Sequence, residues 1–327
     1  MPATFFFAVN VTTPIFAIVL LGLWLRRRHI VSDRFVGTGS KIVFNVALPA
    51  LLFAKLHDVR FAALDPLIIV YSLLAVTIMF IGLHVSSYLW SDRTVRGPFT
   101  QGAFRSNMGI IGLAFCLDLY AGDDTAIALT SIYLAVLTIH YNILATITLV
   151  VHNHGSQNHE DQTHQNKPGQ RLSVRQLVLD ILRNPLIVAI SIALTFAAFQ
   201  WPVHEVILST GQYLAQLALP LALLCTGASI RWSALRTSQP LYWATLLKLV
   251  VVPAAITLTA YGLGFRGMEL GILYLMISAP ASAASYPMVR ELGGDHELAA
   301  GIIASTNLFS IISTTVGIMW LQSLNVF

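Results

Sequence analysis

The strongest constraint in this sequence is a series of long apolar runs that continues from one end of the chain to the other. A run of about 20 apolar residues is long enough to cross the hydrocarbon core of a bilayer as a helix. We place ten such spans, at residues 5–25, 42–56, 66–90, 99–120, 126–151, 178–199, 206–230, 241–263, 268–289 and 298–322. The sequence therefore predicts an all-α integral membrane protein with ten transmembrane helices.

The composition agrees with this class and argues against others. Hydrophobic residues make up 56% of the 327 residues and charged residues only 10%, whereas soluble domains carry about 25% charged residues. Soluble enzymes and nucleic-acid-binding proteins are therefore poor candidates. The chain has no P-loop, nucleophile elbow or HExxH motif, and its histidines have no zinc-site spacing. We expect neither an enzyme nor a bound metal or cofactor.

Lys and Arg are distributed unevenly between the loops. Thirteen of the 19 lie in loops after odd-numbered spans, and only Arg60 and Arg266 lie in loops on the other side. Basic loops face the cytoplasm under the positive-inside rule. We therefore expect a multi-pass protein of the cell membrane, the inner membrane of a bacterium, surrounded by membrane lipids and with both termini outside.

An internal repeat relates the two halves of the chain. Three matches share one offset of 171 or 172 residues: Ala47-Leu48-Pro49 with Ala218-Leu219-Pro220, Pro14 with Pro185, and Gly122-Asp123 with Gly294-Asp295. They predict a first five-helix repeat at 1–151, a polar cytoplasmic linker at 152–177 and a second five-helix repeat at 178–327. Because five is odd, the second repeat enters the membrane from the opposite face, which is typical of secondary transporters.

Small and polar residues interrupt the fourth and ninth spans near their middles. The fourth contains Ser106-Asn107-Met108-Gly109, and residues 278–285 of the ninth read SAPASAAS. Broken helices offer unpaired backbone N–H and C=O groups to a ligand at the membrane midplane. We expect two broken, crossing helices; the alternative is that these residues only allow close helix contact and a tolerated proline kink.

Four short segments resemble the auxin efflux carrier family. They are residues 45–53 (NVALPALLF), Arg183-Asn184-Pro185, Lys248-Leu249 with Pro253, and Ser305-Thr306-Asn307. The resemblance implies a five-plus-five transporter in which helices 4 and 9 cross, with a fold related to bile acid:sodium symporters. It also implies carboxylate substrates, because bacterial members are described as malonate or malate permeases and plant members export auxin.

The candidate substrate-binding residues lie around the two breaks. Carried over by position, the resemblance places the crossing at Ser106, Asn107, Gly109, Ser278, Ala279 and Pro280. To these we add Arg105, Ser282, Thr306 and Asn307. Arg105 can attract an anion, or alternatively reach toward the cytoplasmic face. Residues 278–287 contain no Glu or Gln, which counts against sodium coupling.

Four further polar residues inside or next to spans have coupling or structural interpretations. They are Lys248, Asn45, Asn184 and His140. Lys248 can titrate with transport or replace a coupling cation, or it can make a structural contact. The two asparagines stand near prolines and can bond backbone groups that proline leaves unpaired, and His140 can be a structural histidine or a proton relay. Together with Thr130, Tyr133 and Tyr141 of the same span, His140 can line the cavity.

These features predict a secondary active transporter, a permease or efflux carrier, that moves small organic anions by alternating access. Carboxylates are the expected substrates. Two alternatives remain: a sodium-coupled organic anion symporter, and a ligand sensor that keeps the fold without transporting. We also leave open a homodimer.

Overall fold

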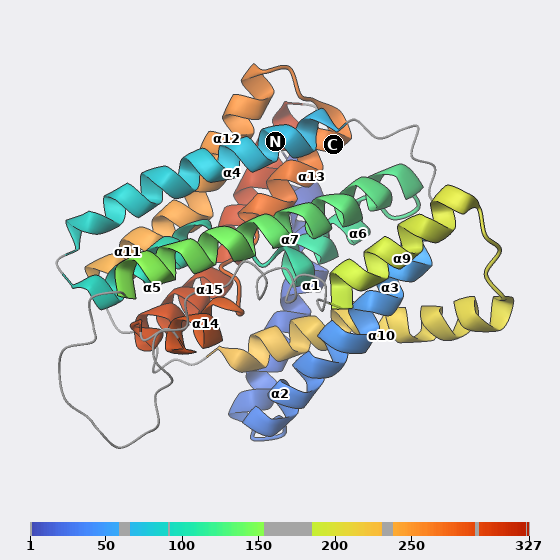
Figure 1. Cartoon of the computed structure of the whole chain (residues 1–327), viewed down its shortest axis with the longest axis horizontal. Helices are drawn as coiled ribbons and strands as arrows, with labels where there is room; N and C mark the ends of the chain where they lie inside the picture. The colour runs from blue at the N-terminus through green and yellow to red at the C-terminus, as the bar shows by residue number, and fades with distance from the viewer. Residues whose placement is uncertain are drawn as a thin grey trace.

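The computed structural model describes residues 2–58, 66–90, 92–153, 185–230, 238–291, 294–324 and 326. Apart from one β-bridge, the regular structure of these residues is helical (Figure 1). Among them, seven helices are long and apolar enough to cross a membrane, and three shorter apolar helices span Met108–Leu119, Pro185–Phe199 and Gly267–Ser278. The predicted all-helical membrane architecture is confirmed at this level.

The helices follow the predicted spans in order. In the first half they are α1 (Pro2–Arg27), α2 (Asp33–Ile42), α3 (Leu48–Leu56), α4 (Leu67–Ser86), α5 (Arg93–Phe104), α6 (Leu113–Leu119) and α7 (Asp124–Asn153). In the second half they are α9 (Pro185–Phe199), α10 (Glu205–Ser229), α11 (Gln239–Leu246), α12 (Val252–Gly262), α13 (Gly267–Ser278), α14 (Ser285–Glu291) and α15 (His296–Ser323). Short helical turns η1 (Val43–Ala47), η3 (Ser87–Leu89), η4 (Met108–Gly112) and η6 (Leu247–Val251) adjoin them.

Two helices begin much earlier than predicted because their first turns are polar. The second span was expected from residue 42, but α2 begins at Asp33, where the Ser32 side chain accepts a hydrogen bond from the backbone N of Phe35 at 3.2 Å. The fourth was expected from residue 99, but α5 begins at Arg93, after the capping side chain of Asp92. A search for apolar runs misses such capped polar starts.

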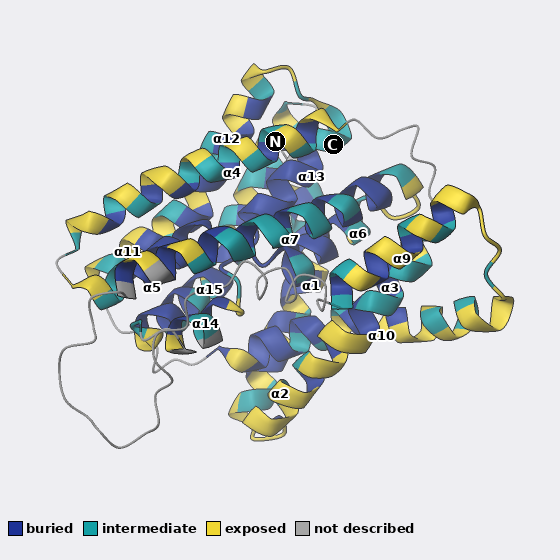
Figure 2. Cartoon of the chain, viewed as in Figure 1, coloured by how far each residue is buried: buried dark blue, intermediate teal, exposed yellow. Residues whose placement is uncertain are grey.

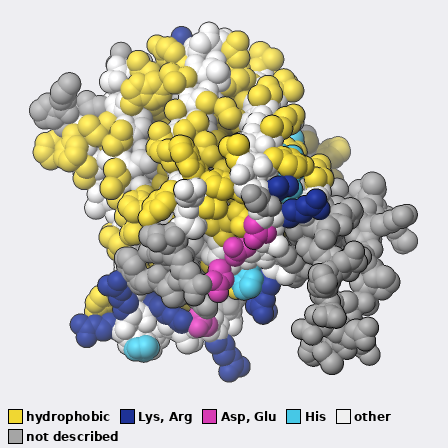
Figure 3. Space-filling model, turned by 90° about the vertical axis from the view of Figure 1, so that its left-hand side faces the viewer, with side chains coloured by type: hydrophobic (Ala, Val, Ile, Leu, Met, Phe, Trp, Pro, Cys, Tyr) yellow, Lys and Arg dark blue, Asp and Glu magenta, His cyan; other side chains and the backbone are white. Residues whose placement is uncertain are grey.

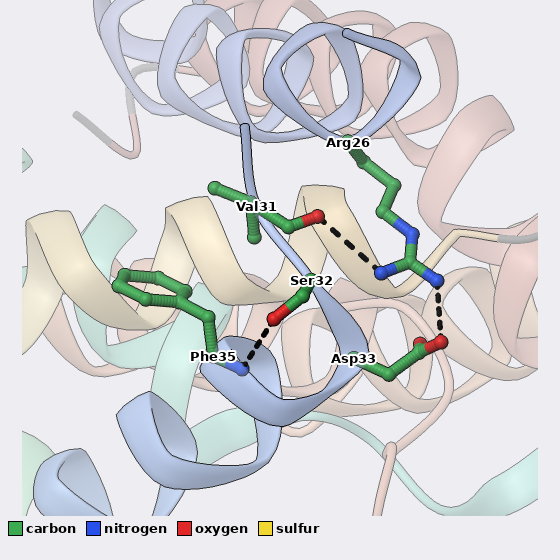
Figure 4. Close-up of polar contacts among 5 residues, drawn as sticks. All are labelled: Arg26, Val31, Ser32, Asp33 and Phe35. Atoms are coloured by element: carbon green, nitrogen blue, oxygen red, sulfur yellow. Dashed lines mark hydrogen bonds and ion pairs between the residues drawn. The ribbon is translucent and has the colours of Figure 1, made fainter. Parts of the chain in front are cut away.

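The turn between α1 and α2 is closed by Arg26 (Figure 4). Its guanidinium donates a hydrogen bond to the carbonyl of Val31 at 3.3 Å and pairs with the Asp33 carboxylate at 2.6 Å. Both charged side chains are partly exposed, so the ion pair orients the turn more than it stabilises the fold.

Two of the π-helical turns stand just before a proline. η1 ends two residues before Pro49, and η6 ends two residues before Pro253. Proline has no N–H to donate to the carbonyl of the preceding turn, and a π-turn is one way for a membrane helix to adjust locally. The second of these turns carries Lys248.

The helices surround a buried centre and turn apolar faces outward. Every residue of α13 from Leu270 to Ser278 is buried (Figure 2), whereas α4 exposes Leu74 and Ile78 by 61% and 67%. Figure 3 shows a broad apolar surface with charged side chains gathered toward one end. Both chain termini lie toward the other end (Figure 1), and the apolar surface matches a face that contacts lipid.

Helices α1 and α10 pack so closely that their backbones lie side by side at Gly227. A Cβ atom built on Gly227 of α10 would lie 1.8 Å from the carbonyl oxygen of Val19 on α1. Small residues allow such contacts between membrane helices, where van der Waals contact replaces the hydrophobic effect as the main attraction. Gly227 therefore fixes the distance between these two helices.

We predict that Gly227→Ala destabilises the protein by about 1–3 kcal/mol, because the added methyl group forces the two helices apart. The matched control is Gly211→Ala on the same helix, where a Cβ would meet no atom within 4 Å. Thermal unfolding in detergent measures both variants. Equal midpoints for the two would contradict the prediction.

Candidate functional site

Helices α5 and α13 both stop in the interior of the protein, where the sequence predicted two breaks. After α5, Arg105 adopts an extended backbone with φ −81° and ψ 110°. After α13, Ala279 has φ −54° and ψ 143°, because the residue before a proline is pushed out of the helical region. Each half-helix has 12 residues, or about 18 Å of rise.

The two breaks cross and pair with each other through the backbone. Ser106 and Ala281 form an antiparallel β-bridge. On either side of it, the N–H of Asn107 donates to the carbonyl of Pro280 at 2.7 Å, and the N–H of Ser282 donates to the carbonyl of Arg105 at 3.0 Å. Each interrupted helix thus satisfies backbone groups of the other.

Helix α15 supplies a further bond to the crossing. The hydroxyl of Thr306 accepts a hydrogen bond from the N–H of Ala281 at 3.1 Å and donates to the carbonyl of Ile302 at 2.7 Å. Thr306 is fully buried. The predicted neighbour from the tenth span therefore holds the second break in place.

A glycine lets the first break lie directly against α13. A Cβ on Gly112, in η4, would lie 2.9 Å from the sulfur of Met276 and 3.3 Å from its Cα. A larger residue at this position would separate η4 from α13 and disturb the crossing.

Lys248 reaches the crossing from η6. Its Nζ donates to the Ser106 hydroxyl at 2.5 Å and to the carbonyl of Ile277 at 2.9 Å. Ser106 in turn donates to the same carbonyl at 2.8 Å. The lysine side chain is fully buried, so it joins the two broken helices rather than extending to the membrane surface.

Arg105 also points inward. Its guanidinium donates to the Asn142 side-chain oxygen at 2.5 Å and contacts the sulfur of Met288 at 2.8 Å. The residue is only 6% exposed. Within the described ranges, neither Arg105 nor Lys248 takes part in an ion pair, so the crossing holds two buried basic side chains among neutral partners.

Two buried polar atoms around the crossing have no hydrogen-bond partner among the described residues. They are Asn107 Nδ2 and Asn307 Oδ1. Buried polar groups are costly to leave unpaired. These atoms therefore supply hydrogen-bonding capacity that a polar ligand can use.

The remaining candidate residues divide into two groups. Gly109 lies in the first turn after the α5 break, and Ser278, the last residue of α13, donates to the carbonyl of Leu275 at 3.5 Å. By contrast, the side chain of Asn45 is exposed and bonds the carbonyl of Lys41, and His140 bonds Thr77. These last two bond their own helix and α4, respectively, rather than residues of the crossing.

Two predictions from the sequence concern residues that the structure does not describe. Asn184 lies outside the described ranges, as does most of the polar linker at 152–177. Among the described residues, no group of three or more His, Cys, Asp or Glu side chains is placed to hold a metal ion.

Sequence reasoning missed the two side chains that contact the Arg105 guanidinium. Asn142 directly follows Tyr141 in the polar stretch of α7, so its position was the available signal. Met288 on α14 has no distinctive sequence pattern, because an interior methionine is most often only a core residue.

An apolar groove lies between α15 and the segment formed by α11, η6 and α12. It has a volume of about 860 Å³ and is lined by side chains such as Leu246, Val250, Phe309 and Ile312. These large hydrophobic side chains are exposed, as expected of a surface that faces lipid.

We predict that Thr306→Val destabilises the protein by about 1–3 kcal/mol, because it leaves the buried N–H of Ala281 without its acceptor. Thr306→Ser keeps the hydroxyl and serves as the matched control. Thermal unfolding in detergent compares the two. A valine variant as stable as the serine variant would show that the bond does not support the break.

Comparisons with known proteins agree with this architecture. A family model described as membrane transport protein matches residues 7–318. An uncharacterized transporter from Methanothermobacter thermautotrophicus is 23% identical over 309 residues, which cover 91% of this chain and 93% of that protein. The family consists of transporters rather than enzymes. The chain is therefore a multi-pass membrane protein and belongs to the membrane transport protein family that includes the auxin efflux carriers.

Proposed function

We propose that this transporter carries small organic anions, most simply carboxylates, through a site at the crossing of the two broken helices. The observation that carries the proposal is the pair of buried basic side chains, Arg105 and Lys248, which have no acidic partner among the described residues. A buried unpaired cation is costly, and a bound carboxylate would supply the missing negative charge.

The neutral groups at the crossing suit a carboxylate as well. Asn107 presents an unpaired amide nitrogen, and the Tyr141 hydroxyl lies beside Ser106 and Arg105. Both groups donate hydrogen bonds. The N–H groups of the first turn of η4, which starts at Met108, add the positive end of a helix dipole.

Helix contacts support our proposal that the halves form an inverted repeat. The contact of α1 with α10 has a counterpart in that of α9 with α3, and the contact of α5 with α15 has one in that of α13 with α7. These are the pairs that a two-fold axis exchanges if the sequence offset is correct. Such symmetry underlies alternating access in many secondary transporters.

The same contacts support a division into two bodies that differ from the sequence halves. Helices α1, α3, α9 and α10 contact one another in series. The crossing helices α5 and α13 instead contact α4, α7, α12 and α15. We propose that these two bodies move relative to each other during transport, rather than one half of the sequence against the other.

The direct test is flux into liposomes that contain the purified protein. Labelled malonate, malate and indole-3-acetate represent dicarboxylates and aromatic carboxylates. We expect saturable uptake of at least one of them that is absent from protein-free liposomes. Absence of saturable flux for every organic anion in the panel would overturn the proposal, and binding without flux would favour a sensor.

We predict that Arg105→Gln and Asn107→Ala each lower the transport rate at subsaturating substrate by about tenfold or more. A buried charge-assisted hydrogen bond is worth ~1.5–3 kcal/mol, and 1.4 kcal/mol corresponds to about tenfold in affinity. Asn10→Ala on the exposed face of α1 is the control. Parent rates in Asn107→Ala would remove that residue from the site.

We also predict the orientation of the chain in the membrane. Arg28→Cys and Trp201→Cys introduce cysteines at exposed positions, one just after α1 and one between α9 and α10. The predicted orientation places these two positions on opposite sides of the membrane. The native Cys116 and Cys225 are buried. A membrane-impermeant thiol reagent should label Trp201→Cys in intact cells and Arg28→Cys only after lysis. The reverse pattern would place both termini in the cytoplasm.

A further inference from the structure

The hydrogen bonds around Lys248 match a neutral amine better than an ammonium ion. A neutral amine has two N–H donors, and the structure provides two acceptors, the Ser106 hydroxyl and the Ile277 carbonyl. An ammonium ion has three donors. Because Nζ makes no further hydrogen bond to a described residue, the third donor would have no acceptor among these residues.

The charge of the surroundings favours the same conclusion. Arg105 immediately precedes Ser106. The guanidinium of an arginine stays protonated in proteins. Electrostatic repulsion disfavours a second cation near this guanidinium. Lys248 is also fully buried, and a buried charge is costly without a counter-ion. The carbonyl ends of α5 and α13 offset part of this cost, but they do not supply a full negative charge.

Among the residues that the structure describes, no other ionisable group of the elements around η6 balances Lys248. Of the elements that contact η6, α13 contributes Tyr274, whose hydroxyl contacts the carbonyl of Ser313, and α11 and α12 contribute Tyr242 and Tyr261. The other helices that contact η6 carry their remaining charged and titratable residues at their N-terminal ends. On α5, α13 and α15 these are Arg93, Arg96, Glu269, His296 and Glu297. Tyr141 on α7 adjoins Ser106 and Arg105. Among the described residues, Arg105, next in sequence to the Ser106 that Lys248 contacts, is thus the fixed charge at the crossing, and it has the same sign.

We propose that Lys248 couples transport to protons, so that an organic anion and one proton occupy the crossing together. In the empty site Nζ is a neutral amine bonded to Ser106 and Ile277. When a carboxylate binds, the amine takes up a proton from the water on the open side and becomes an ammonium ion. The carboxylate then accepts a hydrogen bond from the third N–H. When the anion leaves on the other side, the proton leaves with it. This inference rests on the proposed function and identifies its coupling ion.

The test measures proton uptake when an anion binds. Purified protein in a weak buffer with a pH indicator is titrated with malonate, at a pH where malonate is fully ionised, or with the panel anion that shows saturable flux. We expect about one proton taken up per anion bound, because binding and protonation are linked. Anion binding without proton uptake would overturn the inference while leaving anion transport intact.

Variants assign the proton to Lys248. Lys248→Arg carries its proton permanently, so it should bind the anion with no proton uptake, and a pH gradient should no longer drive its flux. Lys55→Arg changes an exposed lysine on α3 and should behave like the parent. Proton uptake that persists in Lys248→Arg would overturn the assignment.

A second variant keeps the test decisive if the arginine disturbs folding. Lys248→Gln is neutral and should show weaker anion binding and no proton uptake. Flux driven by sodium and indifferent to the proton gradient in the parent protein would favour a sodium symporter and overturn the inference. Absence of both anion binding and flux would instead overturn the proposed function itself.

Discussion

The need to pair backbone groups in an apolar environment governs this structure. Breaking a helix inside a membrane leaves N–H and C=O groups without partners, and lipid cannot supply them. Here the two breaks supply partners for each other, through the bonds of Asn107 to Pro280 and of Ser282 to Arg105. Neither break is satisfied alone, so the fourth and ninth spans must cross, and Thr306 must stand beside them.

Much of this arrangement could be predicted from local sequence. Pro280 ends α13 for a steric reason that acts on the residue before it, and small residues mark the break after α5. The pairing of the breaks could not be predicted in detail. The repeat offset aligns Asn107 with Ser278, whereas the β-bridge joins Ser106 to Ala281, because register at a crossing depends on how two helices rotate and translate. Nor can a sequence reveal that a particular backbone carbonyl, that of Ile277, accepts a lysine.

The polar partners of Arg105 and Lys248 explain why the site suits an anion. A structural salt bridge would have neutralised Arg105 or Lys248 within the protein. Instead, Arg105 contacts an amide and a thioether, and Lys248 contacts a hydroxyl and a carbonyl. Such partners hold Arg105 without cancelling its charge, and they leave Lys248 free to take up a proton when an anion binds. The site therefore retains a positive potential in a low-dielectric environment, where it acts most strongly on a carboxylate.

The position of Lys248 relative to the moving parts bears on how coupling works. Its two acceptors, Ser106 and Ile277, belong to the crossing, and η6 contacts α5, α13 and α15. All of these elements lie in the body that we expect to move as a unit against α1, α3, α9 and α10. A motion between the bodies leaves the bonds of Lys248 unbroken and so cannot by itself change its affinity for a proton. The proton must therefore be gained or lost according to what occupies the crossing, and substrate binding rather than the conformational change sets the coupling.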